Sequence, residues 1–203
     1  MILDAETAAR AGWTLPDLAS ACLDGGARFL QVRAKHSSSR WVLDVAEAVV
    51  ERAHAAGAIV IVNDRADIAR LANADGVHVG QDDLSPAAAR EIVGAGWIVG
   101  LSTHTAAQLD AALVAPVDYV AVGPVFETRT KETGYAAVGV ELVRDAAARA
   151  RPLPVVAIGG ITLERAVEVR RAGAASIAVI GDLLRAGDPI ARVRQYLERL
   201  DRT

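Results

Sequence analysis

The sequence predicts an α/β protein in which eight parallel strands close into a single (β/α)8 barrel. Eight short apolar runs recur along the 203 residues, one about every 25 residues. Each run is continuously apolar, as expected of a strand that is buried on both faces of its sheet. A longer Ala-rich segment with helical spacing follows each run, and this alternation predicts parallel strands joined by helices. Eight such units favour a closed TIM barrel over an open doubly wound sheet.

The expected strands are, in chain order, Met1–Leu3, Phe29–Val32, Ile59–Val62, Val77–Val79, Ile98–Leu101, Tyr119–Val122, Val155–Ile158 and Ile177–Ile180. Helix starts support this count, because Ser85 before Pro86 reads as an N-cap and Thr105 with Gln108 fits a capping box. Thr162 is expected to open the helix after the seventh strand. The glycines expected to end helices in the left-handed conformation are Gly57, Gly94 or Gly96, and Gly173.

Composition excludes several classes of protein. Hydrophobic residues make up 52% of the chain and charged residues 23%, which excludes general disorder. The net charge is −3 without a basic block, and aromatic residues are only 4%, so we expect no nucleic-acid partner. The pattern of a signal peptide or of a membrane span is missing, so we expect no membrane partner and a cytoplasmic protein. We expect residues 1–203 to form one domain and the single cysteine, Cys22, to be a buried core thiol.

The second expected strand ends with side chains suited to an anion. Period-two alternation places Gln31, Arg33 and Lys35 on one side of this strand. In such barrels chemistry collects on the loops that follow the strands. Arg offers a bidentate fork to a phosphate and Lys a point charge. A solvated strand end is the alternative, and it fits Lys35 better than Arg33.

Carboxylates follow the third and fourth strands. Asn63 and Asp64 end the third strand, and Asp82 and Asp83 follow the fourth. Each of these residues alone could be a helix cap. Beside a basic strand end meant for phosphate, however, the carboxylates predict a Mg²⁺ site, because Mg²⁺ takes one or two carboxylates together with substrate phosphates.

The fifth strand ends with Ser102 and His104 on one side. His104 could donate to a phosphate, act as an acid or base, or tie two loops together. The other histidines, His36, His54 and His78, have no partner at metal-ligand spacing, so we expect structural or surface roles for them and no zinc site.

Two later loops are candidates for phosphate binding. The long polar loop after the sixth strand carries Thr128, Thr130 and Lys131, which suits closure over a phosphorylated substrate. Gly160 follows the seventh strand, and Ile180-Gly181 ends the eighth. Loops after strands seven and eight, with an adjoining helix N-terminus, form the recurrent phosphate site of these barrels.

Six strings in this order, QVRAK, NDR, HVGQDD, GLSTHT, VGPVFETRTK and AIGGI, resemble the thiamine-phosphate synthase family over about residues 28–200. The resemblance implies a Mg²⁺-dependent condensation of hydroxymethylpyrimidine diphosphate with the thiazole phosphate, or its carboxylate form, to give thiamine phosphate and pyrophosphate. It implies a dissociative mechanism, with a pyrimidinylmethyl cation captured by the thiazole nitrogen. No nucleophilic side chain is needed, and the sequence offers no obvious one.

The resemblance also implies residue roles. The pyrimidine diphosphate would be held by Gln31, Arg33, Lys35 and Asn63, with Ser102 and Lys131 on the diphosphate. Arg33, Lys35, Ser102 and Lys131 would be the catalytic residues, and Asp64 and Asp83 would ligate Mg²⁺, with Asp82 where the family often has Glu. The thiazole phosphate would contact Thr128, Thr130, Gly160 and the backbone around Ile180 and Gly181.

Two departures and two alternatives accompany the resemblance. The first strand is short, so its contacts to the pyrimidine cannot be carried over, and Ile180-Gly181-Asp182 replaces the usual Val-Ser, which adds a negative charge near the thiazole phosphate. One alternative is a thiazole tautomerase on the same barrel, with His104 as the acid or base. The other is a non-catalytic phosphate-binding protein, which would not need paired carboxylates. Barrels of this size often form homodimers, but no residue pattern here marks an interface.

Overall fold

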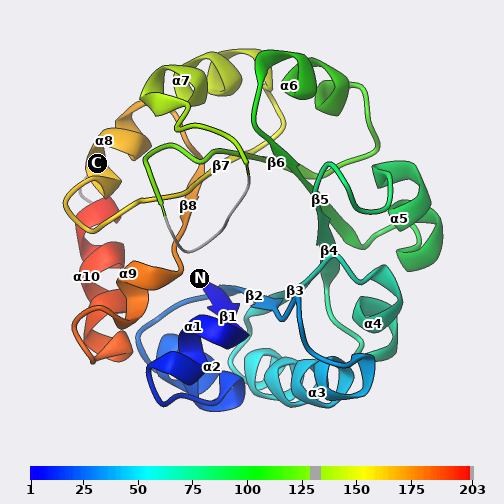
Figure 1. The fold of residues 1–203 in the computed structure, drawn as a ribbon, viewed down its shortest axis with the longest axis vertical. Coiled ribbons are helices and arrows are strands. Elements are labelled where there is room, and N and C mark those ends of the chain that lie inside the picture. The colour runs from blue at the N-terminus through cyan, green and yellow to red at the C-terminus, as the bar shows by residue number, and fades with distance from the viewer. Residues whose placement is uncertain (129–133, 202–203) are drawn as a thin grey trace.

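The structure, a computed structural model, describes residues 1–128 and 134–201 and is a nearly closed barrel of parallel strands (Figure 1). One eight-stranded sheet follows the chain order from β1 to β8. Each strand pairs in parallel with the next, and the Ile2 N–H donates to the Val179 carbonyl oxygen at 3.0 Å, which joins the last strand to the first. The predicted fold class is therefore confirmed.

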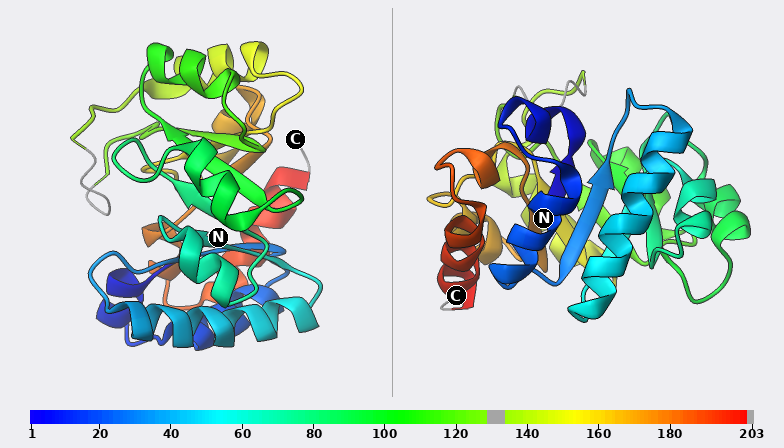
Figure 2. Two further views of the ribbon diagram at one scale, coloured as in Figure 1. Left: turned by 90° about the vertical axis from the view of Figure 1, so that its right-hand side faces the viewer. Right: turned by 90° about the horizontal axis from the view of Figure 1, so that it is seen from below.

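The strands are β1 (Ile2–Asp4), β2 (Phe29–Arg33), β3 (Ile59–Asn63), β4 (Gly76–Val79), β5 (Ile98–Thr103), β6 (Tyr119–Val122), β7 (Val155–Ile158) and β8 (Ser176–Ala178). The helices are α1 (Ala5–Arg10), α2 (Leu15–Asp24), α3 (Ser39–Ala55), α4 (Ala66–Leu71), α5 (Pro86–Val93), α6 (Ala106–Leu113), α7 (Gly139–Arg149), α8 (Ala166–Arg171), α9 (Gly181–Leu184) and α10 (Pro189–Asp201). The side views of Figure 2 show α3 running along the outside of the strands.

All eight predicted strands are present, and their ends differ from the prediction by up to two residues, as at β5, which continues to Thr103 instead of ending at Leu101. Ser85 and Thr105 cap α5 and α6 through their side-chain oxygens, as predicted. The eighth strand ends at Ala178, two residues earlier than predicted, and α8 begins at Ala166 instead of directly after Thr162. The segment between Thr162 and Ala166 is a turn, in which the Thr162 carbonyl accepts from the N–H groups of Arg165 and Ala166.

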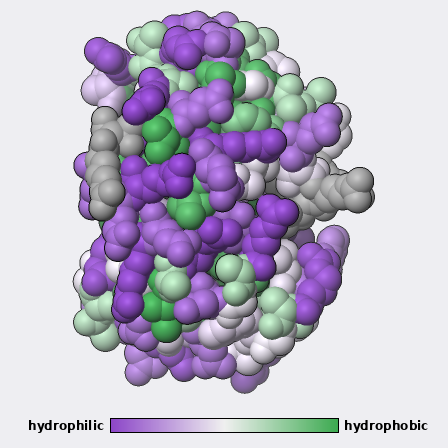
Figure 3. Space-filling model, turned by 90° about the vertical axis from the view of Figure 1, so that its left-hand side faces the viewer, coloured by the Kyte–Doolittle hydropathy of each residue, from purple (hydrophilic) through white to green (hydrophobic). Residues whose placement is uncertain are grey.

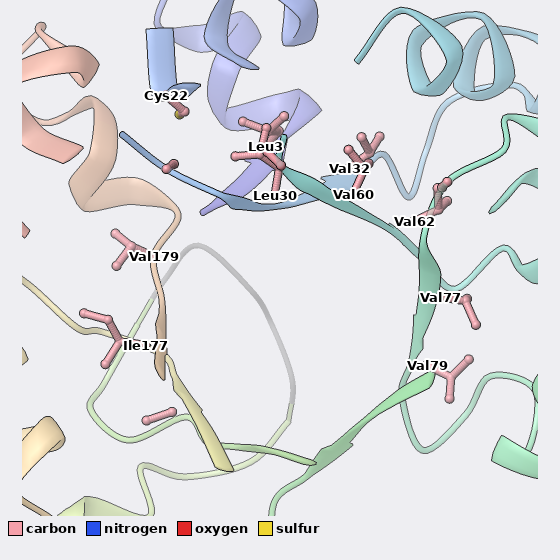
Figure 4. Close-up of a cluster of buried hydrophobic side chains, with 14 of the residues drawn as sticks. Leu3, Cys22, Leu30, Val32, Val60, Val62, Val77, Val79, Ile177 and Val179 are labelled. Atoms are coloured by element: carbon pink, nitrogen blue, oxygen red, sulfur yellow. The ribbon is translucent and has the colours of Figure 1, made fainter. Parts of the chain in front are cut away.

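The main core lies between the strands and the surrounding helices. Alternate strand residues such as Leu30, Val60 and Val77 are fully buried and point away from the barrel axis toward the helices (Figure 4). Cys22 of α2 is buried in the same layer, as predicted. Continuous apolar strands are needed because one side of each strand meets the helices and the other meets the barrel interior.

The barrel interior is filled incompletely. Small residues such as Gly76, Gly100 and Ala121 occupy inward positions, and a Cβ added at Gly100 would lie 2.1 Å from Cζ of the Tyr119 ring. Glycine is therefore required at residue 100 because the Tyr119 ring occupies the space above it. The remaining interior volume forms a cavity that the site uses.

The outer surface of the barrel is largely polar where Figure 3 shows it. On the face that carries α8 and α10, hydrophilic residues dominate and hydrophobic residues form small separate patches (Figure 3). Within residues 1–128 and 134–201, no helix has the length and apolar character needed to cross a membrane.

Candidate active site

Arg33 is anchored at the C-terminal end of β2 by Asp4, the last residue of β1. The parallel register aligns Asp4 with Arg33, and Nη1 of Arg33 forms a salt bridge with Oδ2 of Asp4. Asp4 also accepts from the N–H and the hydroxyl of Thr7, at 2.9 and 2.6 Å, and thereby caps α1. Nε of Arg33 is buried and lacks a hydrogen-bond partner among the described residues. A fixed guanidinium with donor capacity left over is suited to bind an anion.

Lys35, Asp64 and Asp83 form a charged cluster beside Arg33. Nζ of Lys35 lies 3.0 Å from Oδ2 of Asp64, and the Asp64 carboxyl hydrogen-bonds that of Asp83. Burial, together with the neighbouring Asp83, raises the pKa of Asp64 even though Lys35 opposes the shift. Two carboxyl groups held together in a partly buried position are costly without a cation, so this pair fits a divalent metal.

The alternative in which these carboxylates cap helices does not describe the structure. Asp83 accepts from the Gly80 N–H at 2.8 Å within the loop after β4, while Ser85 caps α5. In the described part of the chain, α4 has no side-chain cap. Asp64 has a φ of 65°, a left-handed conformation that non-glycine residues rarely adopt and that often occurs at functional sites.

A cavity of about 510 Å³ lies inside the barrel beneath Arg33. Its polar lining residues toward Arg33 are Gln31, Asn63, His78, Ser102 and Tyr119, and the cavity also reaches Arg28, Asp118 and Ser176, where strands begin, and Tyr196 of α10. Most of the other lining residues are apolar, including Ile2, Val156 and Ile158. The cavity is therefore mainly apolar with a few convergent polar groups, the usual character of a small-molecule binding site.

A second cavity, of about 480 Å³, lies at the C-terminal ends of β6, β7 and β8. The predicted residues His104, Thr128, Gly160, Ile180 and Gly181 all line it. Thr130 and Lys131, also predicted, lie outside the described residues. The structure thus brings every described residue of the predicted thiazole-phosphate set to one cavity.

The two cavities adjoin each other. Ile158, Ala178 and Ile180 line both of them, at the ends of β7 and β8. Two ligands bound in these cavities would be neighbours at the top of the barrel, which is the arrangement that a reaction between two substrates needs.

His104 joins the ends of two strands at the rim of the second cavity. Its Nδ1 hydrogen-bonds the Gly123 carbonyl oxygen after β6, and its ring stacks on Tyr135 with ring centroids 4.2 Å apart. The His104 N–H donates to Oε1 of Gln108 at 2.7 Å. A ring nitrogen that faces a carbonyl must carry the proton, so Nδ1 is the donor. Of the three predicted roles, the structure shows the tying of loops.

The carboxylate of Asp182, which itself lines this cavity, is paired through Oδ2, while its Oδ1 is buried without a hydrogen-bond partner among the described residues. Its Oδ2 accepts from the Tyr196 hydroxyl at 2.5 Å and lies 3.4 Å from Nε of Arg192, both on α10. Tyr196 pairs with this carboxylate in a buried position, and the pKa of its hydroxyl is raised by burial first and by Asp182 second. Asp182 is thus not a lone acid, because Arg192 lies beside its Oδ2.

Several residues at these sites were missed by the sequence reasoning. Arg165 and Arg185 line the second cavity, and Arg165 also donates to the Gly160 carbonyl oxygen at 3.2 Å. Their signal was weak, because each lies among other helical charges. Asp4 could have been found, since alternation along Ile2–Asp4 turns it inward beside Arg33. His78, which the sequence assigns a structural or surface role, is buried inside the barrel and lines the first cavity.

The described residues include no group of three or more His, Cys, Asp and Glu side chains that could hold a metal ion. The Asp64–Asp83 pair is smaller than such a group. It fits Mg²⁺ because that ion is often bound by one or two carboxylates while substrate phosphates and water complete its coordination.

Comparison with known proteins gives one consistent result. The model of a family described as thiamine monophosphate synthase matches residues 2–183, which include all the strands. The thiamine-phosphate synthase of Chlorobium luteolum is 43% identical over 190 residues, covering 92% of the chain and 88% of the relative. That of Koribacter versatilis is 45% identical over 187 residues, covering 92% and 87%. The solved thiamine phosphate pyrophosphorylase from Pyrococcus furiosus has a TM-score of 0.85 at 29% identity, covering 92% of this chain and 89% of that chain.

Proposed function

The chain belongs to the thiamine monophosphate synthase family and is a transferase of thiamine biosynthesis, and we propose that it joins a pyrimidine diphosphate to a thiazole phosphate with the help of Mg²⁺. The observation that carries the proposal is the pair of adjoining cavities, each of which has its own set of polar residues. The first cavity is lined by Arg33, Asn63 and Ser102, whereas Lys35, Asp64 and Asp83 are not among its lining residues and follow β2, β3 and β4 in the chain. The second has the glycine-rich loop after β7 and two arginines.

The pyrimidine diphosphate fits the first cavity. Its heterocycle would occupy the chamber lined by Gln31, Asn63 and Tyr119, and its diphosphate would face Arg33 and Lys35. Asp64 and Asp83 would hold Mg²⁺, which supplies positive charge to the diphosphate oxygens when bound. Lys35, 3.0 Å from Asp64, would then face both the carboxylate and the diphosphate.

The thiazole phosphate fits the second cavity. Its phosphate would be bound by Thr128, by Gly160 and the backbone at Ile180 and Gly181, and by the two arginines that the sequence reasoning missed. Helix α9 has only four residues, so its dipole contributes less than a longer helix would, and the arginines supply most of the positive charge. Thr130 and Lys131, outside the described residues, stay predicted ligands.

The chain's residues would act on the leaving group. The bond between the pyrimidine methylene carbon and the diphosphate oxygen breaks with both electrons going to pyrophosphate, and the thiazole nitrogen lone pair forms the new carbon–nitrogen bond. Arg33, Lys35 and Ser102 would stabilise the charge that develops on the departing pyrophosphate. The adjoining walls at Ile158 and Ile180 would hold the thiazole nitrogen close to the cationic carbon.

The two alternative functions are less well supported. A thiazole tautomerase with His104 as its acid or base would not need the anion cluster on β2 to β4, and Nδ1 of His104 is engaged by the Gly123 carbonyl. A non-catalytic phosphate-binding protein would not need the buried pair Asp64 and Asp83. Both curated relatives reported above are named as synthases.

Three further expectations stay proposals. A single domain over residues 1–203 fits the continuous barrel. A cytoplasmic location fits an enzyme family of thiamine biosynthesis, whose phosphorylated substrates do not cross membranes unaided. The homodimer stays a prediction that sedimentation would check.

The experiment is turnover of both substrates by the purified protein with and without Mg²⁺, following thiamine phosphate and pyrophosphate. We expect product only with Mg²⁺, and a loss of about 100-fold or more in kcat for Asp64→Asn. Asn is the better substitute than Ala because it tolerates the φ of 65° at this residue. The matched control is Asp82→Asn, which removes an exposed carboxylate next to Asp83 and should change kcat less than two-fold. No product with Mg²⁺ would overturn the function, and full activity of Asp64→Asn would overturn the metal assignment.

A further inference from the structure

A chain of hydrogen bonds crosses the barrel interior from β2 to β5. The Gln31 side chain hydrogen-bonds the Tyr119 hydroxyl, which lies 2.8 Å from Nδ1 of His78. On the other side of the same ring, Nε2 of His78 lies 2.8 Å from Oγ of Ser102. His78 and Ser102 are both more than nine-tenths buried. These four side chains come from four different strands and meet in the first cavity.

The chemistry of the groups gives this chain a direction. A neutral imidazole donates from one nitrogen and accepts at the other. When the Gln31 amide donates to the Tyr119 oxygen, the hydroxyl proton of Tyr119 is left to donate to Nδ1 of His78. Nε2 of His78 then carries the imidazole proton and donates to Oγ of Ser102. The hydroxyl proton of Ser102 is consequently left for a further acceptor.

We propose that Tyr119, acting through His78, positions the Ser102 hydroxyl as a hydrogen-bond donor to the diphosphate of the substrate. Tyr119 and His78 are positioning residues, because they act through Ser102. Without the Tyr119 proton, His78 can carry its own proton on Nδ1. The Ser102 hydroxyl would then donate to Nε2, and its proton would no longer reach the anion. The proposal rests on the proposed function in one respect, that Ser102 contacts the diphosphate.

The packing around Tyr119 fixes its ring in the position that the hydrogen-bond chain needs. Its ring stacks on His78 with centroids 5.5 Å apart and an interplanar angle of 25°, and it meets the edge of Phe29 at 6.1 Å. Gly100 provides the space for this ring, since a Cβ there would lie 2.1 Å from Cζ. Burial raises the pKa of the Tyr119 hydroxyl, so this residue keeps the proton that it donates.

The backbone of Ser102 is held by hydrogen bonds that do not involve Tyr119 or His78. Nε2 of Gln81 donates to the Ser102 carbonyl oxygen at 2.6 Å. The next residue, Thr103, donates from Oγ1 to the Ala121 carbonyl oxygen at 3.0 Å and is buried. Loss of the Tyr119 hydroxyl should therefore change the direction of the Ser102 hydroxyl while leaving β5 in place.

The test combines kinetics with a direct view of the imidazole. Tyr119→Phe removes one oxygen and retains the ring, its stacking and its fit over Gly100. We expect kcat to fall about ten-fold, the effect of about one hydrogen bond to a charged group. In a Ser102→Ala background the same substitution should lower kcat less than two-fold, because the hydroxyl that Tyr119 positions is already gone.

The matched control is Thr103→Val, which removes the hydrogen bond of a buried hydroxyl next to Ser102. Thr103 is not part of the hydrogen-bond chain from Gln31 to Ser102. We expect its effect on kcat to be the same with Ser102 and with Ala at residue 102. Equal effects of Tyr119→Phe in the two backgrounds would overturn the proposal, since they would indicate a merely structural role for the hydroxyl.

The nitrogen chemical shifts of His78 test the direction of the chain without any substrate. The free protein should show the proton on Nε2, and Tyr119→Phe should move a large fraction of it to Nδ1. A wild-type proton on Nδ1 would overturn the proposal even if the enzyme is a synthase. Conversely, an Nε2 proton in a protein that makes no thiamine phosphate would leave the chain intact and refute the proposed function.

Discussion

Gly160 lines the second cavity and packs closely against the loop at Phe126 and Glu127. Gly160→Ala tests most directly whether this close packing shapes the cavity. Gly160 has a φ of 63°, and a Cβ added there would lie 2.6 Å from the Glu127 carbonyl oxygen and 2.8 Å from Cβ of Phe126. Glu127 is followed by Thr128, which lines the cavity for the proposed thiazole phosphate. An added methyl group therefore pushes directly on the loop that we propose binds the phosphate.

Two costs add at this position. The left-handed backbone of a non-glycine residue costs about 1–2 kcal/mol. Cβ atoms essentially never approach another atom closer than 3.0 Å, so Glu127 must move by at least 0.4 Å, the difference between 3.0 and 2.6 Å. Overpacking of this kind costs about 1–3 kcal/mol. We expect Gly160→Ala to lower the free energy of unfolding by about 2–5 kcal/mol, or to relieve part of this cost by displacing the loop.

Gly57→Ala is the matched control. Gly57 has a φ of 66°, nearly that of Gly160, but a Cβ there would meet nothing within 4 Å. It lies just after α3, far along the chain from the residues of the second cavity. We expect this control to lose only the strain of about 1–2 kcal/mol, so the difference between the two variants isolates the contact with Glu127.

The assays are urea unfolding of both variants and steady-state kinetics with each substrate varied in turn. We expect Gly160→Ala to raise KM for the thiazole phosphate several-fold, with less than a two-fold change in KM for the pyrimidine diphosphate, whose proposed ligands within the described residues lie on or just after β2 to β5. Equal destabilisation by Gly160→Ala and Gly57→Ala, with both KM values unchanged, would refute the contact and the assignment of the second cavity together.

Two further predictions concern stability. Burial raises the pKa of the Cys22 thiol from 9.0 to about 11, so the folded state holds this proton more tightly than the unfolded state does. The resulting stabilisation of the folded state is complete below about pH 9 and is lost as the pH rises through about 11. In urea unfolding, the free energy of unfolding of the wild type should therefore fall by roughly 1 kcal/mol relative to that of Cys22→Ala between pH 8 and pH 10. A stability difference between the two proteins that does not change with pH would contradict the raised pKa of Cys22. Tyr196→Phe should lower the free energy of unfolding by about 1–3 kcal/mol, because Asp182 is left buried with fewer partners. The control is Tyr135→Phe, which removes a hydroxyl from a residue that is 40% exposed and should cost less than about 0.5 kcal/mol. Similar losses of stability for the two variants would contradict the importance of the Tyr196–Asp182 hydrogen bond.

The strands could be predicted because each is marked by its own residues. A run such as Ile59–Val62 is apolar throughout, and that pattern is required whenever both faces of a strand are buried. The end of β8 was predicted two residues too late for the same reason, since Val179 and Ile180 continue the apolar run although the pairing of β8 with β7 ends at Ala178. Hydrophobicity records burial, whereas the end of a strand is set by the backbone hydrogen bonds of its neighbour.

The site could be predicted only as far as each loop could be read alone. Arg33 and Asp64 stand at the ends of apolar runs, so their place on the active face follows from the run itself. The hydrogen-bond chain through Tyr119, His78 and Ser102 joins residues on three strands and depends on the closure of the barrel and on the space left by Gly100. No segment of the sequence contains that information.

Asp182 shows why the sign of a residue's charge does not by itself indicate its effect on a site. In the sequence it is an acid beside a predicted phosphate loop, where its charge alone would repel the ligand. In the structure α10 brings Arg192 and Tyr196 to its Oδ2, so the carboxylate is paired before any phosphate arrives. The partners that decide the outcome come from a helix packed against the outside of the barrel. The electrostatics of the second cavity therefore depend on the docking of α10 as much as on the loops that line it.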